Sequence, residues 1–118
     1  MGSILVVLEN NCQQTYKLDE KPRWEVGRPY KENQPDIKLY STTVSRKHGS
    51  FQNIDGFWFY IDNHKINGTA YNGRFIDAGI RGRVKPVMLK DGDELIFGCG
   101  KIPTQCKSRV IARFYIRD

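Results

Sequence analysis

Hydrophobic and polar residues alternate along this chain in short runs, and no long window repeats apolar positions at helical spacing. Runs rich in β-branched and aromatic residues predict strands at residues 4–8, 57–61 and 95–97. Residues 109–117 alternate strictly, which predicts a half-buried antiparallel strand. Its buried face is predicted to carry Val110, Ala112, Phe114 and Ile116.

Turn chemistry separates these runs. Asp-Gly or Asn-Gly pairs stand between apolar segments and supply the positive φ angles of tight hairpins, at positions 55–56, 72–73 and 91–92. Residues 29–35 and 77–83 are predicted to be loops. Many short strands at close spacing predict an all-β sandwich or barrel. Its aromatic core is predicted to include Trp24, Phe57, Trp58 and Phe59.

Length and composition fit one domain over residues 1–118, since the chain has 118 residues of which 39% are hydrophobic. No apolar run approaches the roughly 20 residues that span a bilayer, and residues 1–8 are too short for a signal peptide. Three cysteines leave one unpaired, which is typical of a reducing compartment. We therefore expect a cytoplasmic protein without membrane contact, and a nuclear location is an alternative in a eukaryote.

The formal net charge of +6 is concentrated in the second half of the chain, where eleven basic residues stand against six acidic ones. Such an excess favours an anionic partner, which includes phosphate groups, nucleic acid and acidic peptides. An ordinary solvated surface explains the same composition.

No arrangement of residues indicates an enzyme, a metal or a cofactor. The two histidines, His48 and His64, lie sixteen positions apart, and neither has a second ligand at metal-binding spacing. Residues 98–101 resemble a phosphate loop only superficially, because Ile102 stands where a hydroxyl would hold magnesium. A turn is the better interpretation of that segment.

One ordered set of short motifs stands apart from this background. It comprises Gly27-Arg28, Ser45-Arg46-Lys47-His48, Asn67-Gly68-Thr69, Asn72-Gly73 and the segment from Leu89 to Gly98. In order and spacing the set resembles the forkhead-associated (FHA) domain, and the resemblance covers nearly the whole chain. The resemblance implies a β-sandwich of about eleven mostly antiparallel strands that binds phosphothreonine peptides through loops at one end.

The resemblance also implies roles for individual residues. Arg28 and Ser45 are expected to contact the phosphate, and Arg46 or Lys47 can add a charge-assisted hydrogen bond. Asn67 is expected to hold the peptide backbone through its amide, which both donates and accepts.

Further residues of the set are expected to support or modify this site. Gly27, His48 and Gly68 are assigned structural roles, and Thr43 lies near the slot that selects the peptide residue three positions after the phosphothreonine. Where relatives usually carry Ser-Thr before Asn67, this chain has Lys65-Ile66. A hydroxyl is lost there. Either Lys65 compensates by adding charge near the phosphate, or the site binds more weakly, or it accepts a different ligand.

The sequence therefore predicts a non-catalytic module that binds a phosphothreonine-containing protein made by a Ser/Thr kinase. Two alternatives remain open at this point. One is a phosphate-independent interaction scaffold on the same fold, and the other is a basic nucleic-acid-binding domain that stacks bases on exposed tyrosines. No nucleic-acid motif is present, so nucleic acid is not the expected partner. One domain over residues 1–118 is also compatible with a piece excised from a longer protein.

Overall fold

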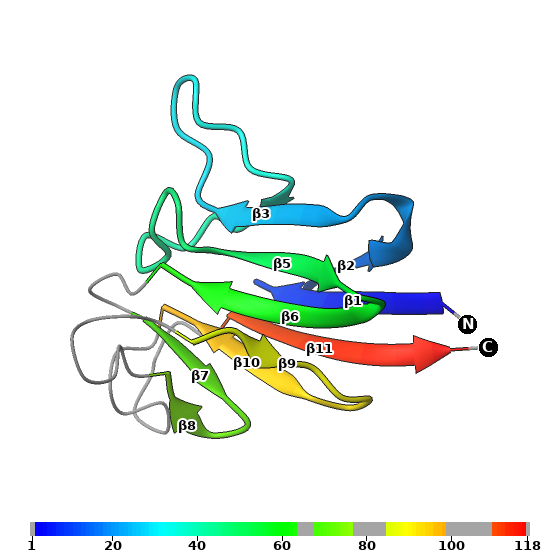
Figure 1. Cartoon of the computed structure of the whole chain (residues 1–118). Coiled ribbons are helices and arrows are strands. Elements are labelled where there is room, and N and C mark those ends of the chain that lie inside the picture. Colours follow the sequence, from blue (N-terminus) through cyan, green and yellow to red (C-terminus); the bar gives the residue numbers. More distant parts are fainter. Residues whose placement is uncertain (1, 64–67, 77–84, 99–109, 118) are drawn as a thin grey trace.

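The computed structural model describes residues 2–63, 68–76, 85–98 and 110–117. These residues form two β-sheets that share one core (Figure 1). In spatial order, the six-stranded sheet consists of β2 (Cys12–Lys17), β1 (Gly2–Glu9), β11 (Val110–Arg117), β10 (Glu94–Phe97), β7 (Thr69–Tyr71) and β8 (Arg74–Phe75). The five-stranded sheet consists of β4 (Ile37–Lys38), β3 (Arg23–Gly27), β5 (Gly49–Ile54), β6 (Phe57–Asp62) and β9 (Val87–Met88).

The predicted all-β sandwich of about eleven mostly antiparallel strands is confirmed. One pair, β3 with β4, is parallel, and every other strand pair in the described residues is antiparallel. A single 3-10 turn, η1 (Leu18–Glu20), connects β2 to β3. No helix in the described part of the chain is long and apolar enough to cross a membrane.

The core lies between the two sheets and takes alternate residues from β1, β3, β6, β10 and β11. Its members have at most 9% of their surface exposed, and they include Leu5, Val26, Phe51, Tyr60, Phe97 and Phe114. Burial of each large apolar side chain contributes about 1.5–3 kcal/mol. A chain of this length therefore stabilises the sandwich, and the loops that it carries, by apolar packing.

Two of the predicted hairpins are confirmed. Asp55 and Gly56 join β5 to β6 with φ angles of 54° and 88°, and Asn72 and Gly73 join β7 to β8 with 48° and 85°. Positive φ at both central residues defines the type I′ turn, whose twist matches that of paired strands. The Asp-Gly and Asn-Gly pairs predicted these turns because glycine, asparagine and aspartate adopt this backbone with little strain.

The third predicted hairpin, at Asp91-Gly92, is wrong. The turn has the expected positive φ, 86° at Gly92, but β9 before it pairs with β6, whereas β10 after it pairs with β7 and β11. The turn therefore carries the chain from one sheet to the other. Turn residues report the local backbone angle, and they do not report which strand the next segment joins.

The alternation of side chains in β6 corrects the predicted aromatic core. Trp58 is 4% exposed and faces the core, as does Trp24, whereas Phe57 is 59% exposed and Phe59 is half-buried. Consecutive strand residues point to opposite faces of a sheet, so three aromatic residues in a row cannot all lie inside. Ile116 is also exposed, because it lies at the far end of β11, past the buried Phe114.

The sandwich has two distinct poles. One pole, which we call the loop pole, is the end at which β3, β6 and β10 finish (Figure 1). Strands β5, β7 and β11 begin at the same pole. Gly2 and Arg117 are strand partners at the opposite pole, where Figure 1 shows both ends of the chain. Arg28, Ser45, Arg46 and Lys47 of the predicted binding motifs lie at the loop pole, where β3 ends and β5 begins.

Candidate functional site

Backbone hydrogen bonds join two loops at the loop pole to each other, and one of these loops to β3. These are the loop of residues 28–36, after β3, and the loop of residues 39–48, before β5. The backbone nitrogen of Arg28 donates to the carbonyl of Ser45 at 3.0 Å, and that of His48 donates to Val26 at 2.9 Å. The loops are therefore an extension of the sheet ladder rather than free segments.

Gly27 makes this close approach possible. A Cβ atom at position 27 would lie 1.9 Å from the Arg46 carbonyl oxygen, far inside van der Waals contact. Only glycine fits where two backbones are this close. The Gly-Arg pair therefore places Arg28 directly against the segment that begins at Ser45.

Four of the predicted ligand residues meet at one pocket, which we call the rim pocket. It has a volume of about 450 Å³ and is lined by Arg28, Asn33, Ser45, Arg46 and Lys47. The Nε atom of Arg28 donates to the Val44 carbonyl at 3.1 Å, and this bond fixes the guanidinium at the pocket wall. In the part of the chain that the structure describes, Arg28 forms no ion pair and the Ser45 hydroxyl makes no hydrogen bond.

The rim pocket also has a residue that sequence reasoning missed, Asn33. Its Nδ2 atom donates to the carbonyls of both Arg28, at 3.2 Å, and Arg46, at 2.8 Å. One amide thereby ties the two loops together. Asparagine in a loop is usually a turn residue, so the sequence held no signal for this role.

Tyr30 is a second residue that was not predicted. The guanidinium carbon of Arg46 lies 3.6 Å from the centre of the Tyr30 ring, which is a close cation–π contact. Tyr30 belongs to the loop of residues 28–36. Its backbone forms a β-bridge with that of Asn33, which closes a turn within this loop. Tyr30 therefore holds the Arg46 guanidinium to one side of the rim pocket.

Beneath the rim pocket, His48 is fully buried and connects three segments of backbone. Its Nδ1 accepts from the Ser45 backbone nitrogen at 3.0 Å, so the ring proton resides on Nε2. Nε2 then faces the Gly68 carbonyl and the Thr69 hydroxyl, both at 2.9 Å. Burial lowers the pKa of His48 below its usual 6.5, although nearby Asp62 and the bond to Gly68 oppose this shift.

Asp62 completes the buried network. Its Oδ1 accepts from the hydroxyls of Tyr60, at 2.8 Å, and Thr69, at 2.7 Å, and lies 4.0 Å from His48 Nε2. Burial, followed by the Asp62 charge, raises the pKa of Tyr60 well above its usual range, so the phenol keeps its proton. Buried polar groups that are fully paired favour one arrangement of the loops they hold.

Thr43 and Gly68 lie at the edges of the site. The Thr43 hydroxyl is 2.8 Å from that of Ser41, and a Cβ at Gly98 would come within 2.5 Å of it, so Thr43 packs on the end of β10. Gly68 has a φ angle of 39°, and a Cβ there would collide with the Phe75 ring at 2.4 Å. Lys65, Ile66 and Asn67 lie outside the described residues, as do Cys99 and Cys106.

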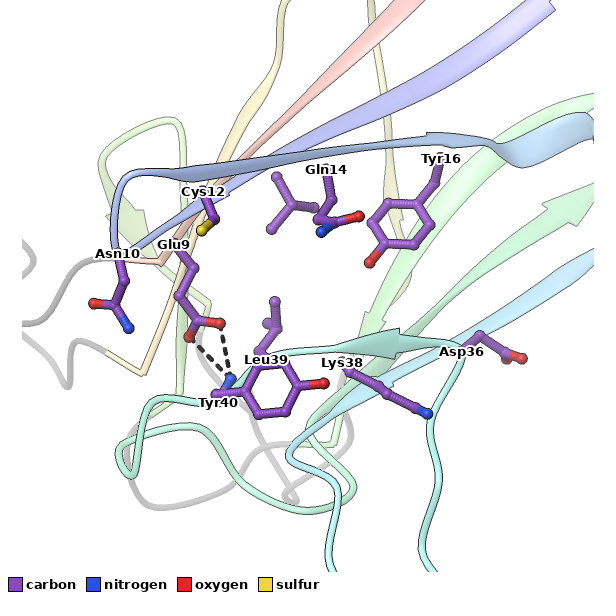
Figure 2. Close-up of a pocket in the computed structure, with 10 residues that line it drawn as sticks. Glu9, Asn10, Cys12, Gln14, Tyr16, Asp36, Lys38, Leu39 and Tyr40 are labelled. Carbon is purple, nitrogen blue, oxygen red and sulfur yellow. Dashed lines mark hydrogen bonds between the residues drawn. The ribbon is translucent and has the colours of Figure 1, made fainter.

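A larger hollow, of about 560 Å³, lies away from the rim pocket, between the β1–β2 hairpin and residues 36–40 (Figure 2). Two acidic side chains, Glu9 and Asp36, stand in its lining against one basic side chain, Lys38, so its charge does not favour an anion. Its acidic residue Glu9 accepts from the backbone nitrogens of Tyr40 and Ser41, each at 2.9 Å. Glu9 therefore connects this hollow to the rim pocket, because it fixes the first residues of the loop of residues 39–48, which carries Ser45.

Neither the rim pocket nor the larger hollow has, among the described residues, a set of side chains that could bind a metal ion. Among the residues that the structure describes, no group of three or more His, Cys, Asp or Glu side chains could hold a metal ion. Cys12 is exposed and free. The chemistry that the rim pocket offers is the binding of an anion by guanidinium, ammonium, hydroxyl and backbone donors.

Comparisons with known proteins agree with this architecture. A family model described as FHA domain matches residues 24–98. The glycogen accumulation regulator GarA of Mycolicibacterium smegmatis is 31% identical over 99 residues, which are 82% of this chain and 55% of that protein. The chain thus spans about half the length of this relative.

Solved structures show the same fold. The FHA domain of the CT664 protein from Chlamydia trachomatis matches with a TM-score of 0.73 and 18% identity, and the match covers all of both chains. A structure from a study of phosphothreonine-dependent FHA domain interactions matches with a TM-score of 0.69 and 19% identity, over 100% of this chain and 99% of the other.

Proposed function

This chain belongs to the FHA-domain family, and we propose that it is a non-catalytic module that binds phosphothreonine in a partner protein. Phosphothreonine-dependent interactions are stated for one of the structurally similar FHA domains. The partner would be a protein that a Ser/Thr kinase has phosphorylated in the cytoplasm. Arg28 and Ser45 would contact the phosphate, with Arg46 and Lys47 beside it and Asn67 on the peptide backbone.

The observation that supports this proposal is the shared pocket of Arg28 and Ser45. These residues are seventeen positions apart, yet both line the rim pocket, and the Arg28 nitrogen is bonded to the Ser45 carbonyl. A phosphate ester carries about −1.5 to −2 charges and three strong acceptor oxygens. A guanidinium, a hydroxyl and further cations on a rigid frame match that ligand, and each charged hydrogen bond contributes about 1.5–3 kcal/mol.

The test compares matched phosphothreonine, phosphoserine and unmodified peptides selected from an oriented phosphopeptide library, with affinity measured by calorimetry. We expect measurable binding of the phosphothreonine form and at least tenfold weaker binding of the unmodified form. Equal affinity for the phosphorylated and unmodified peptides would refute the proposal.

Arg28→Ala tests the pocket itself. We expect it to abolish phosphopeptide binding while unfolding remains cooperative, because the loop keeps its backbone hydrogen bonds and loses only the Arg28 bond to Val44. Arg74→Ala removes an equal charge from exposed β8 and serves as the matched control. Equal losses of binding in both variants would indicate a general charge effect rather than a phosphate site.

A further inference from the structure

A second pocket adjoins the rim pocket, and we call it the side pocket. It has a volume of about 320 Å³, and its lining includes Arg23 and Glu25 of β3 together with Asn63 at the end of β6. The two pockets share Asn33, Arg46 and Lys47. Residues 46 and 47 therefore form a ridge with a hollow on each side.

The backbone of this ridge is held at two consecutive carbonyls. Asn33 Nδ2 donates to the carbonyl of Arg46 at 2.8 Å, and Asn63 Nδ2 donates to that of Lys47, also at 2.8 Å. The backbone nitrogen of Asn63 bonds in addition to the His48 carbonyl at 3.0 Å. Because both flanks are anchored, the ridge is organised before any ligand arrives, and less conformational entropy is lost on binding.

The side pocket has an excess of positive charge. Arg23 is already paired, since its Nε lies 2.7 Å from the Glu25 carboxylate. Arg46 and Lys47 are exposed, and neither forms an ion pair with any carboxylate in the described ranges. Tyr30 holds the Arg46 guanidinium by ring stacking, which leaves its charge uncompensated. One phosphate in the rim pocket cannot occupy both sides of the ridge.

On the basis of the proposed function, we propose that the side pocket binds a second acidic group of the same peptide. The group would be an aspartate or glutamate carboxylate, or a second phosphate, within about two or three residues of the phosphothreonine, since an extended peptide advances about 3.3 Å per residue. Carboxylate and phosphate share the anionic oxygens that guanidinium and ammonium groups recognise. The preferred ligand is therefore a phosphothreonine in an acidic context.

The experiment uses short alanine-rich peptides with one phosphothreonine. One series places a single aspartate at each of the three positions on either side, and a second series places another phosphothreonine there. Affinity is measured by fluorescence anisotropy at low and high salt. The reference, called the neutral peptide, has the phosphothreonine and no other acidic residue. At one or more positions we expect the peptide with the added acidic group to bind roughly tenfold more tightly than this reference, and we expect this gain in affinity to fall as the salt concentration rises.

Lys47→Met tests whether the ridge provides this gain. The quantity compared is the affinity ratio of acidic to neutral peptide, which we expect to fall from about ten towards one. Lys38→Met removes an equal charge at an exposed site on β4 and should leave the ratio at about ten. A cooperative thermal unfolding transition in both variants would verify that they are folded.

The outcomes separate this inference from the proposed function. A ratio near one at every position, with phosphate-dependent binding of the neutral peptide intact, overturns the side pocket alone. A tenfold ratio that Lys47→Met leaves unchanged also overturns it. A gain from either the aspartate or the second phosphate supports it, and the series that responds identifies the source of the acidic group. Phosphate-independent binding of the neutral peptide overturns the proposed function instead.

Discussion

The Nδ1 atom of His48 accepts a hydrogen bond from the backbone nitrogen of Ser45, at 3.0 Å, from a position fully enclosed by the sandwich. Through Nε2 the same ring reaches the Gly68 carbonyl and the Thr69 hydroxyl. One neutral side chain thus fixes the position of the loop that carries Ser45 relative to the segment that precedes β7. Protonation of Nδ1 would replace an acceptor with a donor and break the bond to Ser45.

The free energy of unfolding is therefore expected to fall as the pH drops below about 6.5. The pKa of His48 is lowered in the folded protein, so the unfolded chain binds the proton first and acid favours unfolding. One proton limits the effect to about 1.4 kcal/mol per pH unit. Urea denaturation of the wild type and of His48→Gln between pH 7.5 and 5.5 measures it.

His64 is present in both proteins, so the difference between their pH slopes isolates His48. The variant is expected to have the shallower slope. Identical slopes would mean that His48 is not the group whose folded pKa is depressed.

Gly27→Ala is expected to destabilise the protein by about 1–3 kcal/mol and to weaken phosphopeptide binding, because the new methyl group collides with the Arg46 carbonyl. Chemical denaturation and peptide titration measure the two effects. The control is Gly2→Ala, whose Cβ would meet its nearest atoms at 3.7 Å, an ordinary contact. A stable Gly27→Ala variant with normal affinity would show that the two loops separate easily.

Glu9→Gln is expected to lower the free energy of unfolding by about 1–3 kcal/mol. The charged carboxylate accepts from the backbone nitrogens of Tyr40 and Ser41, and an amide offers one neutral acceptor in its place. Thermal and urea unfolding provide the measurement, with the exposed Glu20→Gln as control. Because Glu9 fixes the base of the loop of residues 39–48, amide exchange in that loop should also become faster. Unchanged exchange would contradict its role as an anchor.

Tyr30→Ala is expected to weaken phosphopeptide binding about two- to fivefold, whereas Tyr30→Phe should bind as the wild type does. The Arg46 guanidinium lies 3.6 Å from the centre of the Tyr30 ring, and such contacts contribute about 0.5–1 kcal/mol at exposed sites. Calorimetry with one peptide on all three proteins makes the comparison. Equal losses in the Ala and Phe variants would point to the hydroxyl instead of the ring.

Much of the fold could be predicted because its strands and turns have strong local signals. The type I′ turns at 55–56 and 72–73 need positive φ angles that few residues adopt. The hairpin at Asn10-Asn11, with φ angles of 50° and 62°, was missed, because it joins apolar β1 to polar β2. β2 is an edge strand with mostly exposed side chains, so it lacks the alternation that indicates a strand.

Prediction of the site was limited by the range of its contacts. Motif spacing singled out Arg28 and Ser45, which do line one pocket. Asn33 bonds to the backbone of Arg46, 13 positions away, and Glu9 to that of Ser41, 32 positions away. Tyr30 acts through its ring, which contacts the Arg46 side chain. A single sequence contains no pattern for such pairings, since an asparagine in a loop or a glutamate at the end of a strand is ordinary on its own.

The pairing of Gly2 with Arg117 has a practical meaning for experiments on this protein. The two residues are neighbours at the pole that faces away from the rim pocket. A dye, a bead or a fused reporter at either end would therefore stand clear of an incoming peptide, and both ends could be tethered to one support together. Captured on a chip in this way, the domain would present its loops outward in a single orientation.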